Sequence, residues 1–219
     1  MGHGTVVVEA CVESVAAAVA AQAAGAARVE LCVNLRDDGT TPPPPTIAQC
    51  RERLAIALFV LIRPRAGSFQ YDDTEFATMC GDIEQAKRLG ADGIVVGGLD
   101  AHGAVDVARI ERLIAAARPL PVTFHRAFDQ TSDPFAALEQ LIELGCDRVL
   151  TSGHADTAET GIPILARLVR QAAGQIGVLA AGKIDSTNVM RIIRETGVRE
   201  IHLRGERLPG VMESLGLRK

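Results

Sequence analysis

The sequence predicts a compact (βα)8 barrel, a closed sheet of eight parallel strands, in one domain that spans residues 1–219. A short sequence motif occurs four times, at intervals of roughly 50 to 65 residues. In each copy a glycine ends an amphipathic segment, a few residues turn the chain, and an apolar run begins. Glycine is the usual residue just past a helix end, because it adopts positive φ without strain. The interval is about twice the length of one βα unit, so each repeat leaves room for a second strand. The four copies of the motif begin at Gly25, Gly90, Gly145 and Gly197.

Apolar runs and helical patterns alternate in the order that such a barrel requires. The runs are short and nearly continuous, as in a parallel sheet that is covered on both faces. The expected strands are Val6–Cys11, Arg28–Cys32, Ile56–Arg63, Gly93–Gly97, Pro121–Phe128, Arg148–Thr151, Ile176–Ala181 and Glu200–Leu203. The expected helices are Ser14–Ala24, Thr46–Leu54, Asp73–Leu89, Asp106–Ala117, Asp133–Leu144, Thr160–Ala173 and Ser186–Thr196. An open doubly wound sheet is the alternative, but it does not require eight such evenly spaced units.

The end of the chain predicts an incomplete eighth unit. The segment Gly205–Lys219 is short, so we expect less than a full last helix from it. The last strand and the flank of the first strand would then expose apolar surface, and surfaces of that kind usually meet a partner. The sequence therefore predicts a homo-oligomer, in the simplest case a dimer. Elsewhere, the proline-rich stretch Asp37–Pro45 is predicted as a loop, and Met1–Gly4 is left out of the argument.

Composition excludes several classes of partner. The net charge is −4, there is no basic stripe, and the chain has no Trp, one Tyr and six Phe, which argues against nucleic acid as a partner. No stretch approaches 18 uninterrupted apolar residues and no signal-peptide pattern is present, so we expect neither a membrane helix nor secretion. Five cysteines without a C-x-x-C pair suit a reducing compartment. We therefore expect a cytoplasmic protein.

Polar residues at the ends of the expected strands are the candidates for function, because sites in such barrels lie at the C-terminal strand ends. The candidates for acid–base chemistry are Glu9, Glu30, Arg63 and His125. The candidates for ligand binding are Asn34, Arg65, Arg126, Asp129, Ser152, Gly182, Lys183, His202 and Arg204. Charged residues inside apolar strands are costly to bury alone, so we expect Arg63 and His125 to pair with Glu9 or Glu30 at the barrel mouth. The alternative is a structural ion-pair network that fills a layer of the barrel.

These residue types favour a pocket for a small anionic metabolite. Histidine titrates near neutral pH, so His125 is the predicted acid–base residue of a lyase-like or isomerase-like reaction. Gly182, Lys183 and Arg204 follow the last two strands, where such barrels often bind phosphate. Lys183 is a weaker candidate for a Schiff base, since it lies past the strand end. A tight turn is an equally good explanation of the glycine.

Two cysteines occupy matching positions on neighbouring strands. Cys11 follows Glu9 by two residues, and Cys32 follows Glu30 by two residues. Neighbouring strands lie about 4.8 Å apart, so the two sulfurs are expected to approach each other. Two soft thiolates suit Cu(I). The alternative is that both side chains are small buried hydrophobic groups, as free cysteines often are.

The strand ends also carry a family resemblance. The segments concerned are Val8–Ser14, Arg28–Leu35, Gly39–Pro42, Ile62–Arg65, Pro121–Asp129 and Leu150–Gly153. In this order, over most of the chain, they resemble the CutC family. The resemblance implies a (βα)8 barrel associated with cytoplasmic copper homeostasis, and it implies that Cys11 and Cys32 match the cysteines proposed as copper ligands in that family. The chain departs from the family pattern at Lys183 and Arg204, which both add positive charge to one rim.

Overall fold

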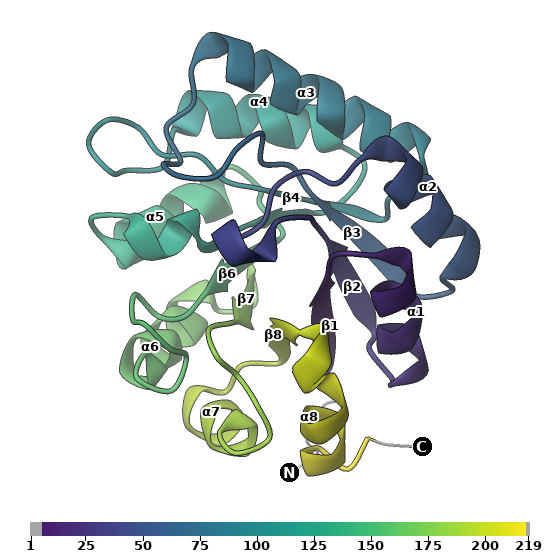
Figure 1. Cartoon of the computed structure of the whole chain (residues 1–219). Coiled ribbons are helices and arrows are strands. Elements are labelled where there is room, and N and C mark those ends of the chain that lie inside the picture. Colours follow the sequence, from purple (N-terminus) through teal and green to yellow (C-terminus); the bar gives the residue numbers. More distant parts are fainter. Residues whose placement is uncertain (1–5, 218–219) are drawn as a thin grey trace.

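The computed structural model describes residues 6–217, and Met1–Gly4 lies outside them. Eight parallel strands form a closed barrel in chain order, which confirms the predicted fold (Figure 1). The strands are β1 Val7–Val12, β2 Arg28–Leu31, β3 Ala57–Leu61, β4 Gly93–Val96, β5 Val122–Phe124, β6 Arg148–Thr151, β7 Gly177–Ala180 and β8 Glu200–Arg204. The helices are α1 Val15–Ala23, α2 Pro44–Arg53, α3 Asp73–Arg88, α4 Val107–Ala117, α5 Pro134–Glu143, α6 Ile162–Ala172, α7 Val189–Thr196 and α8 Leu208–Ser214.

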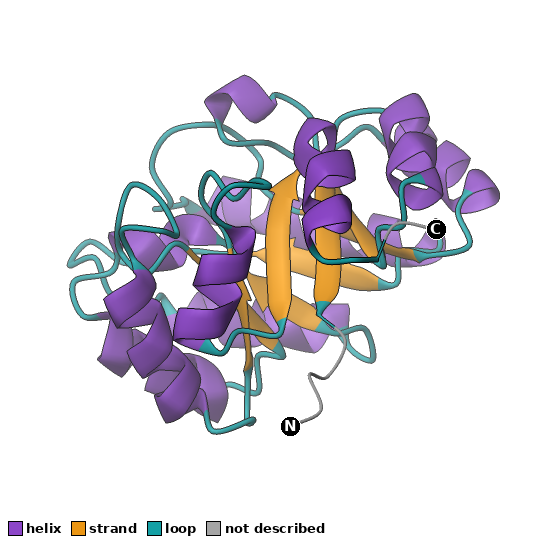
Figure 2. Ribbon diagram, turned by 90° about the horizontal axis from the view of Figure 1, so that it is seen from below, coloured by secondary structure: helices purple, strands orange, loops and turns teal. Residues whose placement is uncertain are grey.

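The helices surround the strands on the outside of the barrel (Figure 2). Local sequence explains where they begin: Ser14 accepts a hydrogen bond from Ala17 N at the start of α1, and Asp72 forms a capping box with Glu75 at the start of α3. Gly197 ends α7 at φ 76°. Among the described residues, no helix combines the length and apolar character that crossing a membrane requires.

Two predicted strands are too long at their C-terminal ends. The strand expected over Pro121–Phe128 stops at Phe124, because Arg126–Gln130 forms a 3-10 helix whose start is capped by His125. The strand expected over Ile56–Arg63 stops at Leu61. In both cases the chain turns early into a rim loop, so the polar residues at these ends stand above the sheet.

The predicted exposed flank at the end of the chain is wrong. The last helix, α8, is short as expected, but three of its own residues, Leu208, Val211 and Met212, are buried. Among the described residues, the large hydrophobic side chains classed as exposed are Val107 and Met190, and neither belongs to the last unit of the barrel. The homo-oligomer stays a prediction, without the apolar surface that first motivated it.

A layer of charged residues fills the barrel interior. Arg28 forms ion pairs with Glu9 and, at 2.7 Å, with Glu200. The predicted pairing of Glu9 or Glu30 with Arg63 or His125 is wrong; within the described chain, Glu9 is bound by Arg28 and His202. The ion-pair layer proposed as the alternative is therefore present.

One aromatic ring completes this layer. Two guanidinium groups contact the Phe59 ring, with Arg28 Cζ 4.8 Å and Arg148 Cζ 4.7 Å from its centre. The ring occupies the space in front of Gly93 on the neighbouring strand, and a Cβ atom there would overlap it. Phe59 is 3% exposed, so the ring has little space to move aside for an added Cβ atom.

We predict that Gly93→Ala destabilises the protein by about 1–3 kcal/mol, the usual cost of overpacking a core. The matched control is Gly81→Ala on the exposed face of α3, where an added Cβ meets no atom within 4 Å. The control is expected to stabilise the protein by up to about 1 kcal/mol, because alanine is the better helix former. Urea unfolding followed by circular dichroism measures both changes, and equal midpoints for Gly93→Ala and wild type would contradict the packing described above.

Candidate functional site

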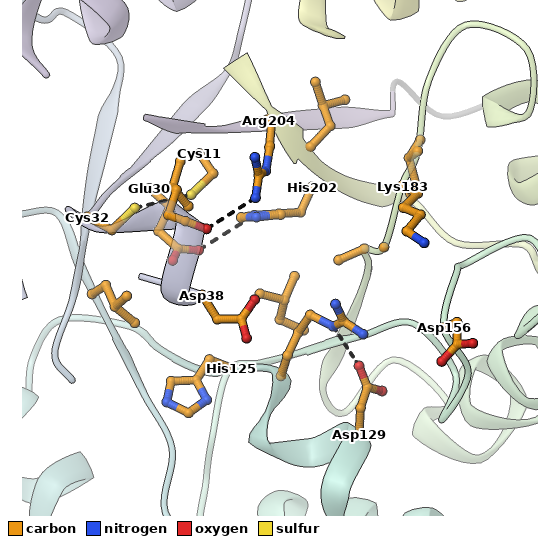
Figure 3. A pocket seen from close by; sticks show the side chains of 18 of the residues that line it. Cys11, Glu30, Cys32, Asp38, His125, Asp129, Asp156, Lys183, His202 and Arg204 are labelled. Carbon is orange, nitrogen blue, oxygen red and sulfur yellow. Dashed lines mark hydrogen bonds and ion pairs between the residues drawn. The ribbon is translucent and has the colours of Figure 1, made fainter. Parts of the chain in front are cut away.

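A cavity of about 640 Å³ opens at the C-terminal ends of the strands (Figure 3). Most of the predicted site residues line it. These are Cys11, Glu30, Cys32, Arg63, His125, Arg126, Asp129, Gly182, Lys183, His202 and Arg204. Four predicted residues are not part of the lining: Glu9, Asn34, Arg65 and Ser152.

The two cysteines lie side by side in the cavity wall. Their Sγ atoms are 3.4 Å apart, as predicted, and Cys32 Sγ lies 3.7 Å from Val12 O. Both side chains are buried, and their strands pair with Cys11 opposite Glu30. The hydrogen bond with Cys32, burial and the nearby Glu30 charge together raise the pKa of Cys11 well above its ordinary value. Without a bound cation, the Cys11 sulfur is therefore a thiol at neutral pH.

A histidine and two glutamates form a buried cluster beside the sulfurs. His202 Nδ1 lies 2.7 Å from Glu9 Oε1 and 3.6 Å from Glu30 Oε2. Burial alone would raise the pKa of Glu9, but the hydrogen bond from His202 and the charge of Arg28 outweigh it and lower the pKa to about 2. Glu9 is thus an ionised acceptor throughout the neutral range.

Glu30 behaves in the opposite way although it lies in the same cluster. Burial raises the pKa of Glu30 to about 7; the charge of His202 opposes this and the charge of Glu9 adds to it. Its Oε2 atom is buried and forms no hydrogen bond with the described residues. Burial works against the charged form of His202, but the hydrogen bond with Glu9 and the charge of Glu30 raise the pKa of its ring.

His125 is a neutral hydrogen-bond donor in this structure. Its Nδ1 accepts a hydrogen bond from Ala127 N at 3.0 Å, so the ring proton lies on Nε2. Burial and the Arg63 charge lower the pKa of the ring to about 3. Nε2 is buried without a protein partner among the described residues, and Gly97 leaves space for the ring. This environment suits a donor better than the predicted acid–base role.

Arg63 holds the rim together. Its Nη1 donates to Asp37 O at 3.0 Å and Gly39 O at 2.8 Å, and its Nη2 donates to Gly67 O at 3.0 Å. The guanidinium also lies over the Phe69 ring, with 4.8 Å between Cζ and the ring centre. Within the described chain, only its Nε is left without a partner, so the residue mainly joins two loops.

Asp129 organises the loop after β6. It accepts hydrogen bonds from Thr151 Oγ1 at 2.5 Å, Ser152 N at 3.0 Å and His154 N at 3.2 Å. It also forms an ion pair with Arg126 at 2.7 Å. The predicted ligand-binding residues Asp129 and Ser152 therefore bind each other, since Ser152 Oγ donates to Asp129 at 2.9 Å.

Two further predicted residues lie in loops outside the cavity lining. Asn34 has a positive φ of 56° and donates to Thr40 Oγ1 at 3.0 Å. Arg65 binds Glu75 and donates to Ser68 O at 2.8 Å. Both residues fix rim loops.

The outer rim carries two predicted cationic residues, Lys183 and Arg204, and further charged residues that the sequence did not predict. Lys183 is exposed at φ 56°; its carbonyl accepts from Asn188 Nδ2 at 3.1 Å, but its ammonium group has no hydrogen-bond or ion-pair partner in the described part of the chain. Arg204 Nη2 donates to Leu35 O at 3.1 Å. Arg207, which lies in the 3-10 turn before α8, also lines the cavity, as do Asp38 and Asp156. The sequence argument missed these three because it stopped at the strand ends.

Comparison with known proteins identifies the family. The model of the CutC family matches residues 6–207, which is nearly all of the described chain. The chain belongs to the CutC family. This confirms the resemblance that the strand ends suggested. Among curated CutC relatives, the family protein CutC of Xanthomonas axonopodis pv. citri is 51% identical over 194 residues, covering 89% of this chain and 81% of the relative. The human copper homeostasis protein cutC homolog is 47% identical, covering 89% of this chain and 71% of the relative.

Solved structures agree with the family assignment. The crystal structure described as the putative copper homeostasis protein CutC from Streptococcus agalactiae has a TM-score of 0.85 at 34% identity, covering 90% of this chain and 98% of that one. An aldolase named QR15 has a TM-score of 0.72 at 14% identity, covering 95% and 94%. The second likeness shows only that the CutC chain shares a barrel fold with that enzyme.

The raised pKa of Glu30 predicts how stability depends on pH. An acid whose pKa is higher in the folded state favours folding at low pH and loses that contribution as pH rises from its unfolded value of 4.5 to its folded value of about 7. The Glu30→Gln variant has no titrating group at this position, so its unfolding free energy does not lose this contribution as pH rises. We expect the unfolding free energy of the variant, relative to wild type, to rise by on the order of 2–3 kcal/mol between pH 4 and pH 8.

The measurement is urea unfolding of both apoproteins at several pH values. Titrations common to both proteins largely cancel in the difference between them. A difference that stays constant across this range would mean that Glu30 titrates normally.

Proposed function

We propose that this CutC-family chain binds Cu(I) through Cys11 and Cys32, and that it serves copper homeostasis in the cytoplasm. The observation that carries the proposal is the 3.4 Å separation of two buried thiols at the edge of an open cavity. Cysteine sulfur is the ligand that Cu(I) prefers among protein groups. The human relative carries copper homeostasis in its name, which supports the same function. The five cysteines, an odd number, are compatible with a reducing compartment.

Local electrostatics favour a bound cation over free thiolates. The hydrogen bond with Cys32 and burial raise the pKa of the Cys11 thiol, and the negative charges of Glu30 and Glu9 add to this effect. The same two charges stabilise a positive ion between the sulfurs. Copper binding is therefore coupled to proton release, and the affinity rises with pH.

We predict that Cys11→Ser/Cys32→Ser weakens Cu(I) binding by more than about 100-fold, since even outer-shell changes at metal sites cost about 10- to 100-fold. Competition with a chromogenic Cu(I) chelator under reducing conditions measures the affinity. Cys80→Ser is the matched control, because Cys80 lies on α3, away from the cavity lining, and should leave the affinity unchanged. Equal affinity in the double variant and wild type would rule out this site.

A second candidate function rests on the size and lining of the cavity. A volume of about 640 Å³ is far more than one ion fills, and it lies in the range of small-molecule sites. Lys183, Arg204 and Arg207 stand at its rim, while Glu30 and His202 lie deeper. We therefore also propose that the chain is an enzyme whose substrate is a small anionic metabolite.

For this second function we predict that inorganic phosphate binds at the rim. Lys183→Met is expected to weaken binding by about tenfold, because a charge-assisted hydrogen bond contributes about 1.5–3 kcal/mol. Isothermal titration calorimetry at low ionic strength measures it. Arg53→Met, an exposed change on α2, is the charge-matched control. Equal weakening in both variants would mean that only net charge attracts the anion.

A further inference from the structure

We propose that His202 is the catalytic base of the cavity, that Glu9 positions it, and that the pair moves a proton on the carbon next to a carbonyl group. The inference deepens the second candidate function and rests on it. The substrate class is a small carbonyl compound that also carries an anionic group. His125 supplies the hydrogen bond to the carbonyl oxygen.

The first step is the orientation of His202. Its Nδ1 lies 2.7 Å from Glu9 Oε1, and Glu9 Oε2 is held in turn by Arg28. Glu9 is 1% exposed, so its carboxylate is a fixed acceptor that keeps the imidazole proton on Nδ1. A buried carboxylate that holds one nitrogen of an imidazole leaves the other nitrogen free to take a proton.

The second step is the position of that other nitrogen. His202 lines the cavity, and its Nε2 has no hydrogen-bond partner among the described residues. The side chain is 14% exposed, in contrast to the 1% of Glu9 behind it. Figure 3 shows the ring among the cavity residues, beside Glu30. Nε2 is thus a basic atom that a bound molecule can reach.

The third step is that two of the histidines that line the cavity, His202 and His125, have opposite tautomers. In its neutral form His202 carries its proton on Nδ1 and presents Nε2 as an acceptor, whereas His125 accepts at Nδ1 and presents Nε2–H as a donor. The His125 donor is buried and unpartnered within the described chain, so a polar ligand atom would satisfy it. One ring removes a proton while the other stabilises the oxygen that becomes negative.

The reaction balances without a cofactor. His202 Nε2 takes the proton from the carbon, the C–H bond breaks, and its electron pair forms the enolate, whose oxygen accepts the hydrogen bond from His125. The imidazolium exchanges its proton with solvent and then returns a proton to the same carbon. The net result is exchange of that hydrogen with solvent, and the rim cations Lys183 and Arg204 are available for the anionic group.

The first experiment needs no substrate. Long-range ¹H–¹⁵N correlation spectra of the full chain report the tautomer of each histidine. We expect His202 as the Nδ1–H form and His125 as the Nε2–H form, assigned through His202→Asn and His125→Asn. A His202 ring with its neutral-form proton on Nε2 would overturn the proposal, and this readout does not depend on the folding of any Glu9 variant.

The second experiment measures exchange. Pyruvate, 2-oxobutanoate and dihydroxyacetone phosphate are incubated with the chain in D2O, and loss of the α-hydrogen signal is followed by ¹H NMR. We expect faster exchange than in buffer for at least one compound, and a loss of about 100-fold or more in His202→Asn, the usual contribution of a general base. Glu9→Gln should lower kcat and shift the pH profile, which a merely structural change would not do. His102→Asn, an exposed change in the loop after β4, is the control.

The two experiments distinguish the role of His202 from the existence of the anion site. Phosphate binding with no exchange of any of the three compounds, or with full exchange in His202→Asn, overturns the role of His202 and leaves the anion site standing. Neither phosphate binding nor exchange overturns both.

Discussion

The ion pairs of Arg28 at the centre of the barrel are the interaction on which the rest of the site depends. The guanidinium joins Glu9 of β1 to Glu200 of β8, so it links three consecutive strands. Together with the hydrogen bond from His202, the charge of Arg28 lowers the pKa of Glu9, and the charge of ionised Glu9 adds to the effect of burial in raising the pKa of Glu30. Removing one partner of a buried ion pair costs about 3–5 kcal/mol, since the other charge is left without compensation. Stability and the protonation states of the cavity therefore have a common origin.

Periodicity was enough to predict the barrel and the proximity of the cysteines. Eight apolar runs in alternation with helical patterns imply a closed order of strands, and that order makes the neighbours of Cys11 and Cys32 predictable. The partners of Arg63 were not predictable in this way. Its guanidinium binds carbonyl groups of loops, and loop paths depend on tertiary contacts that no sequence period records. Arg28 was missed because it begins its strand, at the end of the barrel opposite to the expected site.

The rim shows a second limit of sequence reasoning. Four non-glycine residues in rim loops have positive φ: Asn34, Asp38, His154 and Lys183. Side chains other than glycine rarely adopt this conformation, and such positions persist only where surrounding contacts hold them. Asp129 accepts from His154 N, Arg63 donates to the carbonyls on either side of Asp38, and Asn188 donates to Lys183 O. The rim loops thus contain strained backbone that hydrogen bonds hold in place, and the residue types alone did not indicate this strain.

The Phe59 ring and the guanidinium groups of Arg28 and Arg148 bear on how a ligand enters and leaves the cavity. Arg28 and Phe59 are buried and Arg148 is half-buried, and none of the three belongs to the cavity lining, since both arginines lie at the beginning of their strands. The described residues that line the cavity come instead from the C-terminal strand ends and the loops after them, so the cavity opens at the rim. A product released at the rim leaves on the side from which the next substrate molecule enters, so the two compete for the same opening.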